Sequence, residues 1–194
     1  VTQAQINSTI YSNLAVRGII LNNFTNVRWN GILPVVNLIE QPIESKDRIE
    51  VLKGAAGHYY GFATPSGIIN LVTERPGTTP ITRVDVQGDS NGSIGASFDV
   101  SRRFGTVGMR VNAGTSIIET GVKRTRGERS FVTGALDWNP ADNVEILLDA
   151  EYIYKSITEP TEFSLPAAVN GVIAVPPLQS SSKNLGSEWM QGKG

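Results

Sequence analysis

From residue 81 onward, apolar and polar side chains alternate along five successive segments of the chain. This period of two places apolar residues on one face of a strand and polar residues on the other. The apolar positions are Val84 and Val86; Ile94, Ala96, Phe98 and Val100; Val107, Met109, Val111 and Ala113; Val132, Leu136 and Trp138; and Val144, Ile146, Leu148, Ala150, Tyr152 and Tyr154. The pattern predicts five strands, each with one apolar face.

The connections between these segments alternate in length, which indicates antiparallel hairpins. Residues 104–106 and 139–143 are short turns, whereas residues 88–93, 118–128 and 156–185 form longer connections. Membrane barrels combine short periplasmic turns with long outer loops, and they carry girdles of aromatic residues near the strand ends. Four aromatic residues lie near predicted strand ends here, namely Phe104, Trp138, Tyr152 and Tyr154. A soluble antiparallel sandwich with one face in its core also alternates. The pattern by itself leaves both interpretations open.

Residues 13–76 contain shorter elements separated by glycine turns. Strands are predicted at residues 13–18, 49–52 and 68–73, and a short helical turn at residues 43–48. Residues 22–26 read as a loop, and residues 27–29 lead into the Asn30-Gly31 pair, which favours a hairpin. We expect a small mixed α/β unit that buries too little surface to be stable alone.

Composition narrows the functional classes. The chain has 194 residues, a net charge of −1 and no cysteine. Such a charge provides no electrostatic footprint for nucleic acid, and the lack of cysteine excludes disulfides and thiolate metal sites. No run approaches the roughly 18 apolar residues of a membrane helix, and no signal peptide begins at Val1. Were the protein exported, it would need such a signal, and the sequence would then be part of a longer chain.

Candidate catalytic groups have simpler explanations. Residues 88–92 (GDSNG) match the serine-hydrolase elbow, but Ser90 lies between two alternating segments and the single histidine, His58, precedes it. His58 has no second histidine or cysteine with which to bind a metal. We therefore predict no enzymatic activity, no cofactor and no metal site. The carboxylates Asp99, Glu145, Asp149 and Glu151 fall on the polar strand face, which predicts a solvated or interior-facing surface.

One dense basic run, residues 123–126 (KRTR) with Arg129, completes the candidate chemistry. Most such runs are solvated loops. In an outer loop of a membrane barrel, these cations would also meet phosphates or other anions.

Several ordered motifs resemble a known family. Residues 48–76 read RIEVLKGAAGHYYGFATPSGIINLVTERP, and Arg17-Gly18 and Trp29-Asn30-Gly31 precede them. This order resembles the plug domain of TonB-dependent outer-membrane receptors of the siderophore type. The chain departs from the family at Ala55, where proline usually follows the glycine.

The resemblance implies a mixed α/β plug segment at residues 1–77, followed at residues 78–194 by the first five strands, with outer loops, of an antiparallel transmembrane β-barrel. Five strands cannot close a barrel, so we expect further strands outside this sequence. The implied function is outer-membrane uptake of a ferric siderophore or similar chelate, energised by the inner-membrane TonB complex, with outer-membrane lipid as surroundings. The alternatives are a truncated receptor without transport activity and a soluble β-rich hydrolase using Ser90.

The resemblance also implies roles for individual residues. Arg17 and Lys53 match plug positions that bind barrel glutamates, a lock that ligand binding relaxes; a local pair with Glu50 or Glu44 is the alternative. Apical plug loops face the ligand, which implies contacts from Asn22, Asn23, Phe24, Pro34, Val36 and Asn37, although Phe24 and Trp29 are equally suited to the plug core. The polar strand faces should turn toward residues 13–76, with Val84, Phe98, Val111, Leu136 and Ile146 pointing away.

Overall fold

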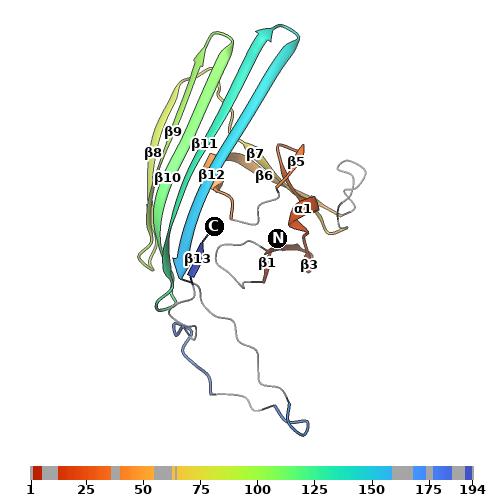
Figure 1. Ribbon diagram of the computed structural model, residues 1–194, viewed down its shortest axis with the longest axis vertical. Helices are drawn as coiled ribbons and strands as arrows, with labels where there is room; N and C mark the ends of the chain where they lie inside the picture. The colour runs from red at the N-terminus through yellow and green to blue at the C-terminus, as the bar shows by residue number, and fades with distance from the viewer. Residues whose placement is uncertain are drawn as a thin grey trace.

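In the computed structural model, the strands among the described residues form three sheets. The structure describes residues 2–5, 13–35, 40–54, 63, 65–158, 168–173, 177–184 and 191–193. A sheet of long strands forms a curved wall, and two small sheets lie on its inner side (Figure 1). We call the wall the long sheet, and the described residues from Thr2 to Gly77 the small-sheet region. No helix among the described residues is long and apolar enough to cross a membrane.

The long sheet contains the five predicted strands in chain order. They are β8 (Ile81–Gly88), β9 (Ile94–Phe104), β10 (Val107–Glu119), β11 (Arg126–Ala141) and β12 (Val144–Thr158), all antiparallel to their neighbours. The turns β9–β10 and β11–β12 lie together at one end, at the top of Figure 1. The predicted five-stranded antiparallel sheet is confirmed.

Two boundaries of the long sheet differ from the prediction. The connection expected at residues 118–128 shortens to residues 120–125, because β10 and β11 stay paired as far as Glu119 and Arg126. Thr115, Ile117 and Ile118 near this end favour extended backbone. A sixth strand, β13 (Gln191–Lys193), pairs with β12 and lies beyond the five predicted strands.

The small-sheet region consists of short strands joined by tight turns. One sheet has the order β1 (Thr2–Gln5), β2 (Asn13–Val16), β3 (Ile19–Ile20); the other has β5 (Leu33–Pro34), β4 (Val27–Trp29), β7 (Gly67–Thr73), β6 (Lys46–Lys53). Asn30 and Gly31, in the three-residue connection between β4 and β5, have φ of 52° and 74°, the left-handed values of a type I′ turn. The predicted strands, this hairpin and the helical turn, η1 (Ile43–Ser45), are confirmed.

One segment expected to be a loop is a single helical turn, α1 (Asn23–Asn26). The side chain of Asn22 accepts a hydrogen bond from the backbone N–H of Phe24, at 2.9 Å. This contact satisfies a backbone donor that the start of a helix leaves unpaired, so Asn22 caps the turn.

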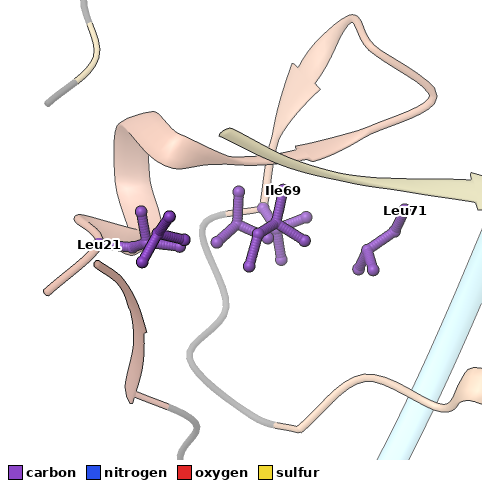
Figure 2. Packing of buried hydrophobic residues seen from close by; sticks show 6 residues of the cluster. Leu21, Ile69 and Leu71 are labelled. Atoms are coloured by element: carbon purple, nitrogen blue, oxygen red, sulfur yellow. The ribbon is translucent and has the colours of Figure 1, made fainter. Parts of the chain in front are cut away.

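The hydrophobic core of the small-sheet region gathers around β7, the central strand of its sheet. Ile69 and Leu71 of β7 pack with Leu21 and neighbouring valines (Figure 2). The buried cluster is Val16, Leu21, Val27, Val35, Ile69 and Leu71. Burial on both faces explains why β7 carries apolar residues at adjacent positions, on either side of Asn70, rather than in strict alternation.

The two faces of the long sheet have opposite chemistry. Val84 is 71% exposed and Phe98 46% exposed, and Val111 is exposed too, all on the outer face. Leu136 and Ile146 share this face by register, opposite Met109 and Trp138 respectively. The inner face buries polar and charged side chains, namely Asp99, Ser101, Arg110, Asn112, Thr133, Asp137 and Lys155. The predicted orientation of the polar face is confirmed.

The inner face is less uniformly polar than predicted. Phe131, Ala135 and Ile157 are buried there. Phe131 lies against Gly114 of β10, where a Cβ atom would come within 2.7 Å of the ring. Glycine on one strand therefore makes room for an aromatic ring on the next.

Candidate functional site: the charged interface

Charged residues of the long sheet meet oppositely charged residues of the small-sheet region along the inner face. The strand register places Asp99, Asn112, Thr133 and Glu151 in one row across β9–β12. Arg110 and Asp149 share an adjacent row on this face, as do Arg103 and Asp137 in the next. Alternation along each strand thus delivers ionised groups to a single surface.

Arg75 follows β7 and binds two carboxylates of the long sheet. Its Nη1 atom lies 3.0 Å from Asp137 Oδ1, and its Nη2 atom contacts Asp149. Asp149 also accepts a hydrogen bond from Asn30 Nδ2 at 3.1 Å. The Asn30 turn and the end of β7 are thereby both tied to β12.

Glu74, the neighbour of Arg75, faces a cation instead. Arg110 donates two hydrogen bonds to Asp99, at 2.9 and 2.7 Å, and its Nη2 atom lies 2.7 Å from Glu74 Oε2. The last contact is close without being aligned as a hydrogen bond, so it is an ion pair only. Burial raises the pKa of Glu74, and the positive charge of Arg110 only partly offsets this.

Residues 40–46 form a second set of contacts, with β11 and β12. Lys46 pairs with Glu151, and the two side chains are only 2% and 4% exposed. Lys46 Nζ also lies 5.3 Å from the centre of the Trp29 ring. Glu44 pairs with Arg129, and Glu40 pairs with Lys155. Charges this deeply buried require such partners, because an unpaired buried ion is costly.

The residues predicted as a lock do not take part in this interface. Arg17, in the β2–β3 turn, and Lys53, at the end of β6, are both exposed. Neither forms an ion pair with a residue that the structure describes. The suggested local partners are engaged elsewhere, Glu50 with Arg48 and Glu44 with Arg129. The lock remains a prediction.

The residues predicted to contact ligand are only partly placed. Asn22 and Phe24 are exposed at the start of α1, on the surface of the small-sheet region. Asn23 belongs to α1 and Pro34 to β5. Val36 and Asn37 lie outside the described residues. These contacts also remain predictions.

The residues considered as catalytic or metal-binding candidates either have structural roles or lie outside the described residues. Ser90 is in the turn of the β8–β9 hairpin, where the carboxylate of Asp89 accepts the backbone N–H groups of Asn91 and Ser93. The strand β9 follows Ser90, so the hydrolase elbow lacks its strand-to-helix context. His58 lies outside the described residues, and no metal-binding cluster occurs among those described.

The basic run forms a docked loop. Arg124 donates to the carbonyl of Asn184 at 3.2 Å, and the backbone N–H of Lys123 donates to the carbonyl of Ser182 at 2.8 Å. Lys123 and Arg126 are exposed at the end of the long sheet away from the two short turns.

Sequence comparison finds receptors of iron chelates. The ferrichrome receptor FcuA of Yersinia enterocolitica is 30% identical over 186 residues, which cover 92% of this chain and 24% of the receptor. The ferrioxamine receptor of the same organism is 25% identical, covering 74% of this chain and 21% of the receptor. The chain thus spans about a quarter of the length of these curated relatives. No family model matches the chain.

Solved structures show the same fold. The ferric preacinetobactin receptor BauA of Acinetobacter baumannii superposes with a TM-score of 0.83 at 23% identity, covering 97% of this chain and 28% of BauA. The ferripyoverdine receptor of the Pseudomonas aeruginosa outer membrane superposes with a TM-score of 0.79 at 22% identity, covering 93% of this chain and 25% of the receptor.

Proposed function

Because the chain is homologous to TonB-dependent siderophore receptors, we propose that it supplies part of the plug and the first wall strands of a receptor that takes up a ferric siderophore. The family consists of outer-membrane receptors of Gram-negative bacteria that bind ferric siderophores; they are transporters and not enzymes. In this proposal, residues 1–77 belong to the plug and residues 78–194 to the barrel wall.

The observation that carries the proposal is the contrast between the two faces of the long sheet. Its inner face forms ion pairs with the small-sheet region, through Arg75 and Lys46 among others. Its outer face exposes large apolar side chains such as Val84, Leu148 and Phe98. A water-soluble sheet covers its apolar face with protein, whereas a sheet that borders lipid leaves that face bare and buries its polar face.

Transport through such a receptor requires the plug to release part of this interface. The energy is proposed to come from the TonB complex of the inner membrane, as the family implies. Asn22 and Phe24, exposed at the start of α1, are proposed ligand contacts, because amide and aromatic groups suit a neutral or peptidic chelate.

The lipid-facing orientation can be tested with single cysteines, because the natural chain has none. Val84→Cys and Asp85→Cys are a matched pair, since both positions are exposed on β8 and they point to opposite faces. A bimane label at residue 84 should be quenched by brominated lipid in outer-membrane vesicles, and a label at residue 85 should not. Equal quenching at both positions would contradict the proposed orientation.

Uptake requires a separate measurement. Cells that lack their own siderophore receptors and carry the gene encoding this chain would be supplied with radioactive iron as ferrichrome or ferrioxamine, the ligands named for the two Yersinia relatives. We expect uptake that stops when tonB is deleted. A lipid-facing β8 without any uptake would favour the alternative, a receptor fragment that does not transport.

A further inference from the structure

Two cations lie side by side on the inner face of the long sheet. Arg129 of β11 and Lys155 of β12 are directly opposite in the strand register. Their side chains are 13% and 5% exposed. Like charges directly opposite each other destabilise an antiparallel pair, and burial strengthens the repulsion. The position therefore needs negative charge from elsewhere in the protein.

The plug supplies that charge from the segment before β6, in which Glu44 belongs to the short helical turn η1. Glu44 contacts Arg129, and Glu40 lies 2.5 Å from Lys155. Glu40 is 50% exposed, so its carboxylate is accessible to solvent. Glu44 Oε2 is buried without a hydrogen-bond partner among the described residues. Both glutamates precede β6, so no strand pairing holds them in place.

The two cations lie near the end of the sheet where the longer connections emerge. Arg129 follows the start of β11 at Arg126, and Lys155 precedes the end of β12 at Thr158. In the proposed receptor this end faces the outside, because the short turns of membrane barrels are periplasmic. A ligand arriving from outside would reach these cations before the network around Arg75.

We propose that Arg129 and Lys155 form an anion-exchange site. The carboxylates of Glu40 and Glu44 occupy this site in the closed state. When they leave, the two cations bind a carboxylate- or phosphate-bearing anion, including an anionic ferric chelate. The inference rests on the proposed function for the identity of that ligand. Because the plug and the anion compete for the same cations, binding of either weakens the other by the same factor.

The exchange predicts that removing the plug carboxylates exposes an anion site. Purified protein in detergent micelles would be titrated with pyrophosphate, by calorimetry at constant ionic strength. We expect Glu40→Gln/Glu44→Gln to bind pyrophosphate roughly ten-fold more tightly than the natural chain does. Adding Arg129→Met and Lys155→Met to that variant should abolish the gain.

The exposed loop cations provide the control. Lys123→Met/Arg126→Met on the same background should retain the gain, because these residues lie outside the exchange site. Circular dichroism verifies folding, and Glu40→Gln alone serves if the double variant does not fold, since Glu40 is half exposed. Equal affinities for all variants, or a gain that disappears with the loop cations, would overturn the exchange site. Uptake by the natural chain would still stand, so the two proposals fail separately.

Discussion

The buried pair of Lys46 and Glu151 allows a sharp test of how the plug is held. We predict that Lys46→Met destabilises the protein strongly, since methionine keeps much of the aliphatic stem but removes the charge. Glu151 would remain as a carboxylate that is only 4% exposed. Removing one member of a buried ion pair costs about 3–5 kcal/mol of unfolding free energy, largely because the other charge stays buried. Loss of the cation–π contact with Trp29 adds about 0.5–2 kcal/mol.

A double-mutant cycle separates these contributions. Lys46→Met/Glu151→Met removes both charges, so its cost should fall well below that of Lys46→Met, because neither ion then has to lose its water. Arg48→Met is the matched control on the same strand. Arg48 is 57% exposed in its pairs with Asp47 and Glu50, and exposed pairs contribute about 0–1 kcal/mol.

The assay is equilibrium unfolding by urea in detergent micelles, followed by far-ultraviolet circular dichroism. Extrapolation to zero urea gives the free energy of unfolding for each variant. The reasoning is refuted if Lys46→Met costs no more than Arg48→Met. It is also refuted if the double variant loses the sum of the two single losses.

Three further outcomes are expected. Gly67→Ala should lower the unfolding free energy by about 1–3 kcal/mol in urea titrations, because Gly67 has φ of 127° and a Cβ atom there would lie 2.2 Å from Leu52 O. Gly18→Ala should cost less, because a Cβ atom at residue 18 would meet no atom within 4 Å. Burial raises the pKa of Glu74 above 4.5, so the folded protein favours the protonated carboxyl. As pH rises above 4.5 through the raised pKa, the unfolding free energy of the natural chain should therefore fall relative to that of Glu74→Gln. Urea unfolding at several pH values measures this difference. Val111→Arg should cost about 2–4 kcal/mol for folding into lipid bilayers if residue 111 lies near the bilayer midplane.

The strands of the long sheet were predictable because a period of two needs no knowledge of distant contacts. The alternation that places Val111 outward also places Arg110 and Asn112 inward, whatever they contact. The burial of Phe131 on the inner face was not predictable in this way. Its inward ring depends on Gly114 of the neighbouring strand, and nothing near Phe131 in the sequence records that space.

The charged interface was only half predictable. The polar strand face identified Asp149 and Glu151 as interior-facing carboxylates, but not Arg75 and Lys46 as their partners. Lys46 and Glu151 are 105 residues apart in the sequence, and a single sequence carries no signal for pairs at such separation. Glu44 was considered only as a local partner, since its contact with a distant arginine appears once the chain is folded.

Glu44 and Lys46, separated by a single serine, bind partners of opposite sign. If the segment that carries these residues shifted by two positions, so that Lys46 took the place of Glu44 beside Arg129, attraction would become repulsion. The alignment of the plug along the wall is therefore specified by charge as well as by shape. A segment shifted in this way would lose both ion pairs, so the order of charges favours the observed position.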